Sequence, residues 1–368
     1  MGTGRARHVL VAAGGTGGHL FPAEALAAAL GRRGVGFDLA TDERAVHYGG
    51  NFPARATHII PSATVRGRDP FSLMKTAGTI GGGIVKSWAL LGDLKPVVVI
   101  GFGGYPTLPP LLAASLRGIP TIIHEQNAVM GRANRFLAKR VTAIATGFRG
   151  LAMPTQELGA KTTWVGNPVR PAVILASSTP YAAPEIGGKL NLLVFGGSQG
   201  ARVMSDVVPP AIQQLEPALW SRLHVVQQAR DEDVDAVKKI YADMRISADV
   251  APFFPDLPLR MAASHLVIAR SGASTVAELA AIGRPSILVP LPGAIDQDQM
   301  ANAGMLEIAG GAIRLPQAEF TPARLASEIS ALAAEPQRLA AMAAAAKKAG
   351  TLDAADRLAD LVLKVAKG

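Results

Sequence analysis

Residues 8–19 read HVLVAAGGTGGH, a short apolar run that ends in four glycines and a histidine. Residues 190–201 read LNLLVFGGSQGA and repeat the pattern, with Gly14 and Gly196 182 residues apart in a chain of 368. Runs that are apolar at every position are typical of strands buried on both faces of a parallel sheet. A glycine turn after such a strand leads into the helix of a βαβ unit. Each half of the chain is therefore predicted to open its own α/β domain.

The same alternation of short apolar runs and longer alanine-rich stretches continues along the chain. It predicts an α/β fold with two Rossmann-like domains whose parallel sheets face a central cleft. The predicted strands are His8–Ala13, Phe37–Thr41, His58–Ile60, Val97–Ile100, Thr121–His124, Ala143–Thr146, Leu190–Phe195, Leu223–Gln227, Ala248–Phe253, Leu266–Ala269, Ser286–Val289 and Ala312–Leu315. The predicted helices include Pro22–Arg33, Thr275–Ile282, Ala323–Lys348 and Asp353–Lys367.

A stretch rich in Pro, Ser and Ala runs from Gly166 to Gly188 and predicts a domain boundary. We expect an N-terminal domain over residues 1–165 and a C-terminal domain over residues 166–349. Residues 350–368 carry apolar side chains at helical spacing. We expect them to form an amphipathic helix that packs back on the N-terminal domain.

Composition narrows the class of protein. Apolar residues make up 49% of the chain and charged residues 18%, so the chain can bury a sizeable core and is not disordered. The absence of cysteine excludes disulfides, thiolate zinc sites and a cysteine nucleophile. No uncharged apolar window reaches the roughly 18 residues of a membrane span, which predicts an intracellular protein. The net charge of +9 indicates either an anionic partner or merely a basic surface.

Three glycine loops follow predicted strands, at Gly14–His19, Gly101–Pro106 and Gly196–Ala201. Glycine lets backbone amides approach a ligand closely, and a helix N-terminus that follows favours negative charge. Ligands of open α/β sheets bind at this edge of the sheet. The loops contain neither G-x-G-x-x-G nor a P-loop, which disfavours NAD and ATP sites. Asp38 and Asp42 nevertheless keep a dinucleotide ribose site open as an alternative.

Polar residues follow several of the same strands. His19 is a candidate general base because an imidazole with its ordinary pKa near 6.5 can exchange a proton near neutral pH. The alternative is a loop histidine bonded to the backbone. Glu278 can bind both hydroxyls of a ribose, or it can simply cap a helix in a capping box with Thr275. Asp296–Gln299 can bind sugar hydroxyls or a divalent metal.

Seven motifs are specific when taken together and in order. They are GGTGGHLFPA (14–23), GFGGYPTLPP (101–110), HEQNAVMGRANR (124–135), VGNPVR (165–170), GGSQGA (196–201), ARSGASTVAELAAIGRPSILVPLP (269–292) and DQMANA (298–303). Through them the chain resembles the MurG family of bacterial peptidoglycan N-acetylglucosaminyltransferases over nearly its whole length.

The resemblance implies a GT-B glycosyltransferase that inverts the configuration at the transferred sugar. The C4 hydroxyl of N-acetylmuramic acid in lipid I would attack the anomeric carbon of UDP-N-acetylglucosamine, giving lipid II and UDP. The C-terminal domain would hold most of the nucleotide sugar, and no metal or cofactor is implied. The implied partners are UDP-N-acetylglucosamine, lipid I (undecaprenyl-pyrophosphoryl-MurNAc-pentapeptide) and an anionic membrane surface. The implied location is peripheral, on the cytoplasmic face of the inner membrane.

The resemblance also implies roles for particular residues. Glu278 would bind the ribose, Ser198 and Arg170 the diphosphate, and the backbone near Phe254 the uracil. Gln299 would contact the sugar. His19 is the best-placed general base. The complete set implied for UDP-N-acetylglucosamine is Thr16, Gly17, Gly18, Asn127, Arg170, Ser198, Phe254, Ala273, Ser274, Thr275, Glu278 and Gln299. The set implied for the acceptor is Gly103, Gly104, Tyr105 and Glu125.

The segment from Arg66 to Trp88 mixes apolar and basic residues, with Lys139 and Arg140 as possible neighbours. A lipid-linked acceptor favours an interfacial patch there. The alternative is an ordinary helix whose apolar face lies in the core.

Three other functions compete with sugar transfer to a lipid acceptor. Another GT-B enzyme, such as a glycolipid transferase or a UDP-N-acetylglucosamine 2-epimerase, shares the fold, although the epimerase needs no carbohydrate acceptor and so no loops such as GFGGYP and HEQN. A nucleic-acid-binding module is disfavoured because basic residues are dispersed and aromatic residues make up only 5% of the chain. An NAD oxidoreductase is disfavoured by the glycine spacing.

Overall fold

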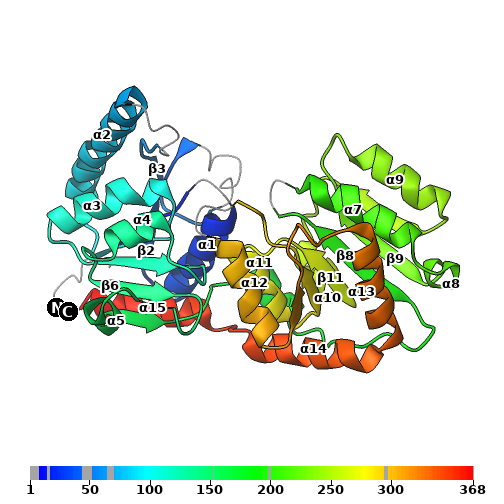
Figure 1. Cartoon of the computed structure of the whole chain (residues 1–368). Coiled ribbons are helices and arrows are strands. Elements are labelled where there is room, and N and C mark those ends of the chain that lie inside the picture. The colour runs from blue at the N-terminus through cyan, green and yellow to red at the C-terminus, as the bar shows by residue number, and fades with distance from the viewer. Residues whose placement is uncertain are drawn as a thin grey trace. The chain divides into compact units, whose positions relative to one another are not determined.

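The computed structural model describes residues 8–14, 17–43, 52–63, 70–151, 153–197, 200–293 and 297–367. The chain forms two compact units. Unit 1 comprises residues 1–170 and 352–368, and unit 2 comprises residues 171–351. Each unit is a parallel β-sheet with helices on its faces (Figure 1). The predicted α/β class with two Rossmann-like domains is therefore confirmed.

The described part of unit 1 contains a seven-stranded parallel sheet in the order β3-β2-β1-β4-β5-β6-β7. The order reverses direction between β1 and β4, which is the point where open α/β sheets bind their ligands. The strands are β1 (His8–Ala12), β2 (Gly36–Thr41), β3 (Thr57–Ile59), β4 (Val98–Gly101), β5 (Thr121–Glu125), β6 (Ala143–Thr146) and β7 (Thr162–Trp164).

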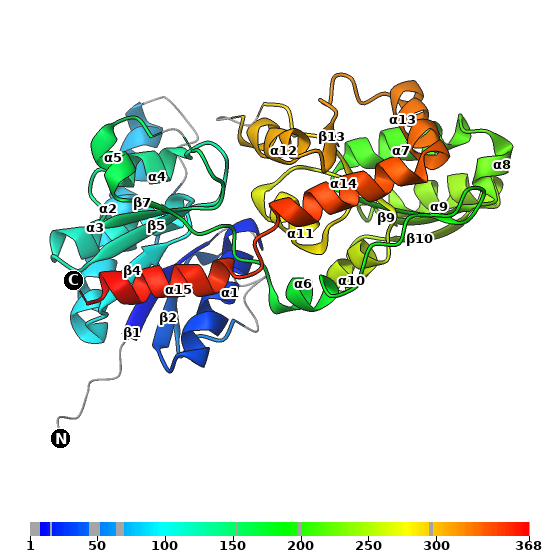
Figure 2. The same cartoon turned by 90° about the horizontal axis from the view of Figure 1, so that it is seen from below.

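Both faces of this sheet are buried because its strands are apolar at consecutive positions. Val9 and Val11 pack with the helices α1 and α15, whereas Leu10 and Ala12 belong to a second cluster with α3 and α4. Figure 2 shows α15 alongside α1. The helices are α1 (Gly17–Arg32), α2 (Pro70–Leu94), the 3₁₀ turn η2 (Tyr105–Thr107), α3 (Leu108–Leu116), α4 (Arg132–Leu137), α5 (Gln156–Ala160) and α15 (Ala354–Val365).

The described part of unit 2 contains a six-stranded parallel sheet in the order β10-β9-β8-β11-β12-β13, which reverses between β8 and β11. The strands are β8 (Leu190–Phe195), β9 (Leu223–Gln228), β10 (Ser247–Ala251), β11 (Leu266–Ala269), β12 (Ser286–Leu288) and β13 (Ala312–Arg314). The helices are α6 (Pro171–Ala176), α7 (Arg202–Gln213), α8 (Pro217–Trp220), α9 (Val234–Asp243), α10 (Leu257–Ala262), α11 (Ala273–Ile282), α12 (Asp298–Ile308), α13 (Pro322–Ala334) and α14 (Pro336–Ala349).

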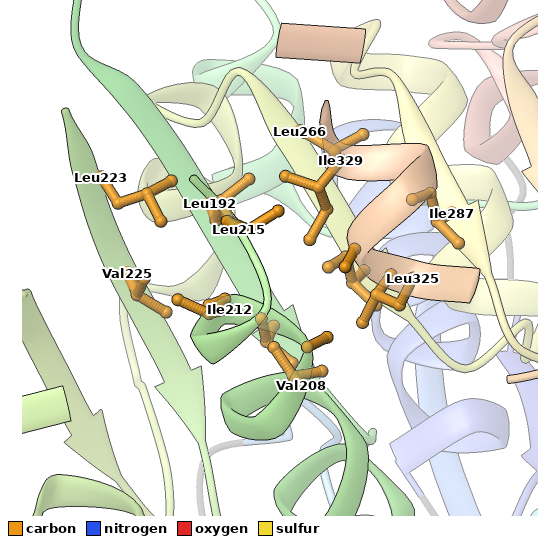
Figure 3. Packing of buried hydrophobic residues seen from close by; sticks show 14 of the residues in the cluster. Leu192, Val208, Ile212, Leu215, Leu223, Val225, Leu266, Ile287, Leu325 and Ile329 are labelled. Carbon is orange, nitrogen blue, oxygen red and sulfur yellow. The ribbon is translucent and has the colours of Figure 1, made fainter. Parts of the chain in front are cut away.

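One face of the unit 2 sheet carries a continuous apolar core. Leu192 of β8, Val208 of α7 and Ile329 of α13 all belong to it and are fully buried (Figure 3). Helices α7 and α13 pack against each other over this face. Burial of such side chains is the main favourable term that holds the sheet and helices together.

Two predicted helices differ from the structure, and one strand was missed. Helix α1 begins at Gly17, so Pro22 lies inside it and not in its first turn. Proline there removes only the bond to the carbonyl of Gly18, and the buried apolar face of α1 outweighs that loss. The predicted helix 323–348 is two helices, α13 and α14, because Pro336 disfavours helical geometry at Glu335. Strand β7, at an edge of the sheet, was not predicted.

Candidate functional site

Two glycine loops of unit 1 meet at the point where its strand order reverses. Gly14 follows β1, and Gly103 and Gly104 follow β4. A methyl group on Gly14 would lie 2.8 Å from the ring of Pro106, so the two loops are in direct contact. Gly103 and Gly104 have φ values of 84° and 76°, a left-handed backbone that glycine adopts without strain. Tyr105 then begins η2 directly after them.

His19 lies in the first turn of α1, against the second of these loops. Its ring is close enough to Gly103 and Gly104 that a methyl group on either would lie within about 3.5 Å of it. Its Nδ1 is 3.0 Å from Oε1 of Gln126. Gly17 and Gly18 lie beside it in the same turn. The structure therefore brings His19 together with the two glycines predicted to contact the acceptor.

Glu125 ends strand β5 and organises the loop that follows. One carboxylate oxygen accepts hydrogen bonds from the backbone and side-chain amides of Asn127, at 2.9 and 3.2 Å. The other accepts from the backbone amide of Gly131 and from Nδ2 of Asn134. Glu125 is buried, so these bonds use it to shape the loop. Its predicted contact with the acceptor remains a prediction.

His124 is fully buried one residue earlier. Its Nε2 donates to the backbone carbonyl of Gly166, 3.0 Å away, and its ring packs against Phe102. Burial lowers the pKa of the His124 imidazole to about 4, and the bond to Gly166 only partly opposes this shift. His124 is therefore neutral in the folded protein at neutral pH and joins β5 to the segment that ends unit 1.

We expect stability to fall as the pH drops from about 6.5 towards 4. In that window the unfolded chain binds a proton at His124 and the folded chain does not. A shift of this size corresponds to about 3 kcal/mol. Urea unfolding at pH values on both sides of 6.5 measures the slope. The variant His124→Gln keeps a donor for Gly166 but cannot titrate, so it should flatten this part of the profile. An unchanged slope in that variant would contradict the assignment.

Arg170 lies at the end of unit 1 and contacts α1. Its guanidinium carbon is 4.2 Å from the ring centroid of Phe21. Half-buried Glu24 is on the same helix, and burial raises the pKa of its carboxyl while Arg170 opposes the shift. Arg170 is thus held against α1, the helix whose first turn carries His19.

In unit 2, helix α11 begins where the strand order reverses. Its N-cap is Gly272, so the amides of Ala273, Ser274 and Thr275 form its first turn and lack helical acceptors. The structure contradicts the alternative in which Thr275 and Glu278 form a capping box, because both residues lie inside the helix. Extended geometry at Gly272 (ψ 149°) starts α11 earlier. Glu278 is buried on the second turn.

Gln299 joins α12 to the same strand end. Its Oε1 accepts from the backbone amides of Ser271 and Leu291, and Ser271 Oγ donates to its carbonyl. Within the described residues no acceptor is paired with its Nε2. Buried Asn302 donates to the carbonyl of Ser271. The side-chain NH₂ of Gln299 is therefore a candidate hydrogen-bond donor to a ligand at the end of β11.

The third glycine loop also has a defined framework. The amide of Gly196 donates to Oε1 of Gln228, and a methyl group on Gly196 would collide with the backbone of Ala201. Gly197 and Gly200 both have positive φ and close a turn. Two predicted ligand residues, Thr16 and Ser198, lie outside the described residues.

The predicted uracil region follows β10. The Phe254 ring is buried, with the Arg260 guanidinium 4.3 Å from its centroid, so this ring cannot stack on a base. Its neighbour Phe253, which is 68% exposed, was not singled out from the sequence. An exposed aromatic face can stack on a base. Its position two residues beyond the end of β10 is the signal that distinguishes it.

The structure does not fit Asp38 as a ribose ligand of a dinucleotide site. Asp38 is fully buried in β2, where its carboxylate lies 3.2 Å from His58 and 3.4 Å from Arg55. A ribose cannot reach a carboxylate in that position.

Two family models match this chain. Residues 9–146 match the glycosyltransferase family 28 N-terminal domain, and residues 191–358 match the corresponding C-terminal domain. Relatives from Bradyrhizobium diazoefficiens and Rhodopseudomonas palustris strain BisB18 are each 63% identical over 97% of this chain, and cover 98% and 96% of their own lengths. Both are named UDP-N-acetylglucosamine--N-acetylmuramyl-(pentapeptide) pyrophosphoryl-undecaprenol N-acetylglucosamine transferase.

Solved structures of glycosyltransferases and related enzymes are also similar to this chain. Acinetobacter baumannii MurG superposes with a TM-score of 0.78 at 29% identity, covering 97% of this chain and 99% of its own. A UDP-GlcNAc 2-epimerase from Neisseria meningitidis reaches 0.67 at 13% identity, covering 97% and 100%, a likeness of fold alone. The resemblance drawn from the seven motifs is therefore confirmed. The chain belongs to glycosyltransferase family 28, in its MurG branch.

Proposed function

We propose that this chain transfers N-acetylglucosamine from UDP-N-acetylglucosamine to the C4 hydroxyl of N-acetylmuramic acid in lipid I, forming lipid II. The 63% identity to transferases of that name over 97% of the chain carries the proposal. The geometry supports it because each sheet offers suitable groups where its strand order reverses. Unit 1 offers a histidine beside two glycines, and unit 2 offers the N-terminus of α11.

His19 is the general base of the proposed reaction. The acceptor oxygen forms a bond to the anomeric carbon while the bond from that carbon to the diphosphate breaks, and UDP leaves with the electron pair. The hydroxyl proton passes to His19. Attack from the side opposite the leaving group produces the β-1,4 link.

Unit 2 holds the nucleotide and stabilises the leaving group. The first-turn amides of Ala273, Ser274 and Thr275, at the positive end of α11, favour the negative charge that grows on UDP. Glu278 accepts from the ribose hydroxyls, and Nε2 of Gln299 donates to the sugar. Arg170 of unit 1 adds a cation for the diphosphate. Asn127 contributes to the sugar site, and Gly103, Gly104, Tyr105 and Glu125 form the acceptor loop region.

Release of UDP with and without a lipid I analogue tests the proposal. Acceptor-dependent UDP release together with a new disaccharide product is the expected result. UDP release that ignores the acceptor, or formation of the 2-epimer of the sugar, would reject the proposal and favour an epimerase.

Unit 1 also carries a surface suited to the lipid acceptor. Met74, Val85 and Trp88 are exposed on α2 at spacings of 11 and 14 residues, which place them along one face of the helix. Within the described residues no helix is both long and apolar enough to cross a membrane. We therefore infer peripheral association with an anionic membrane on its cytoplasmic face.

Basic and apolar side chains alternate on this surface. Arg117 lies over the ring of Trp88 and Arg140 over the ring of Phe136, both at 4.7 Å. Lys75 and Lys86 are exposed on α2, each next to an exposed apolar residue. Exposed apolar groups of this size on a helix favour the interfacial patch over an ordinary core-facing helix.

The double variant Lys75→Ala/Lys86→Ala should bind anionic vesicles about 30-fold more weakly, since each basic residue near the surface contributes about 1 kcal/mol. Cosedimentation with vesicles that contain or lack anionic lipid measures the change. Lys238→Ala/Lys239→Ala removes two exposed lysines of α9 and serves as the matched control. Equal binding of both double variants, or no preference of the parent protein for anionic vesicles, would contradict the patch.

A further inference from the structure

Gln126 is buried between the first turn of α1 and the end of β4. Its Nε2 donates to the backbone carbonyl of Phe102 at 3.1 Å, and its Oε1 lies 3.0 Å from Nδ1 of His19. The side chain is only 3% exposed. It therefore bridges the two glycine loops of unit 1 through the histidine itself.

The two contacts fix which way the Gln126 amide faces. A carbonyl oxygen such as that of Phe102 can only accept, so the side-chain NH₂ must point towards it. The side-chain oxygen is then the atom that faces His19. An amide oxygen only accepts, so Nδ1 of the imidazole must carry the proton that is shared with it.

This arrangement directs the basic lone pair of the neutral imidazole to Nε2. That atom lies on the side of the ring next to Gly104, since a methyl group there would be 3.4 Å from Nε2. If the Gln126 oxygen were removed, the hydrogen bond that favours the Nδ1-protonated tautomer of His19 would be lost. An imidazole protonated on Nε2 cannot accept a proton at that atom.

The backbone around Gln126 is also held. Nδ2 of Asn167 donates to its carbonyl at 2.8 Å, and the preceding Glu125 is fixed by the loop bonds described above. The neighbouring His124 is bonded to Gly166. Gln126 thus has little freedom to turn away from His19, as expected of a group that positions another.

We propose that Gln126 is a positioning residue for sugar transfer, which holds His19 in the Nδ1-protonated form, so that the lone pair that accepts the acceptor's proton is on Nε2. The proposal rests on the proposed role of His19 as general base. Gln126 does not itself touch the reacting atoms.

Gln126→Leu should lower kcat by about 10- to 100-fold, the range found when a group that orients a metal-binding histidine is removed, because the orienting role is the same. KM for UDP-N-acetylglucosamine should stay near its original value, because neither Gln126 nor His19 is among the residues proposed to hold the nucleotide. Nitrogen NMR of the full-length protein with labelled histidine should show His19 protonated on Nδ1 in the parent and shifted towards Nε2 in the variant.

The variant Gln126→Glu tests the proposal through the pH dependence of kcat, which would not change if Gln126 had only a structural role. A carboxylate beside Nδ1 stabilises the imidazolium, so the acidic limb of the kcat profile should move to higher pH. The matched control is Gln227→Leu, which removes a buried glutamine bonded to Tyr241 and to the carbonyl of Met204 in unit 2. It should cost stability but leave the pH limb and the His19 spectrum unchanged.

A double-mutant cycle separates the possible failures. If Gln126 acts through His19, then Gln126→Leu should cost nothing further in a His19→Ala background. Full activity of His19→Ala would overturn the general-base role. A large loss for His19→Ala combined with additive effects, or with an unchanged His19 proton position in Gln126→Leu, would overturn the positioning role alone.

Discussion

His19→Ala should lower kcat for sugar transfer by about 10²–10⁴-fold, the usual contribution of a positioned general base. The acceptor hydroxyl would then have to lose its proton to water. Affinity for UDP should change little, because the proposed contacts to UDP come from α11 and Arg170, and His19 is not one of them. Steady-state UDP release with a lipid I analogue measures kcat, and equilibrium titration with UDP measures the affinity.

A matched histidine control is available in unit 2. Nδ1 of His224 on β9 lies 3.0 Å from Oγ of Ser247, and β9 is not one of the strands at which either sheet reverses its order. His224→Ala should therefore retain the turnover of the parent protein. If His19→Ala also retained near-normal turnover, the base would have to be sought elsewhere at the ends of the unit 1 strands.

The position of His19 explains why a large effect is expected. The ring is confined by Gly103 and Gly104 on one side and by Gln126 on the other. A base that is already oriented loses no rotamer freedom when the acceptor binds. Alanine at position 19 removes the proton acceptor and leaves the glycine turn in place, since the positive φ values of Gly103 and Gly104 do not depend on the imidazole.

The strands and glycine loops were predictable from the sequence because their physical signals are local. Buried parallel strands such as β6 and β11 are runs of apolar residues, and their bounds were predicted correctly. Strand β7 was missed because three residues at a sheet edge, TTW, carry no such run. Gly272 was overlooked as a helix start because glycine is a weaker N-cap signal than threonine.

The contacts that give the candidate site its geometry were not predictable, because they join residues far apart in sequence. In the sequence, Gln126 is one polar residue among several in a predicted loop. The residue to which it is hydrogen-bonded, His19, is 107 positions away in the chain. The burial of Asp38, which excludes it as a ribose ligand, depends on Arg55 and His58 arriving from other segments. Such pairings follow from sheet topology, which local periodicity does not encode.

Arg284→Met should destabilise unit 2 by about 3–5 kcal/mol, because several buried carbonyl groups would lose their hydrogen-bond donor. Arg284 is 1% exposed and donates to the backbone carbonyls of Ala262, Ile282, Gly283 and Thr179. Among the described residues no carboxylate is ion-paired with it. Burial lowers the pKa of this guanidinium from its ordinary value.

Helix ends compensate for the missing carboxylate. Ala262 is the last residue of α10 and Ile282 the last of α11, so the negative ends of two helix dipoles converge on the guanidinium. The same residue anchors Thr179 near the start of unit 2. Arg284 thus fixes the C-terminal end of the helix whose N-terminus faces the proposed leaving group. Methionine fills a similar volume but satisfies none of these carbonyls.

Trp220 provides a probe that is specific to unit 2, because the other two tryptophans, Trp88 and Trp164, lie in unit 1. In a background with both of those changed to phenylalanine, urea unfolding followed by fluorescence should show the loss for Arg284→Met. Arg324→Met removes an exposed arginine paired with Glu328 and should lower the free energy of unfolding by less than about 1 kcal/mol.

Arg284→Lys keeps the positive charge but lacks the several N–H donors of the guanidinium, so its stability should fall between those of the parent and Arg284→Met. Coincident unfolding curves for Arg284→Met and the parent would mean that desolvation of the guanidinium cancels its hydrogen bonds, and that the helix ends contribute no net stabilisation.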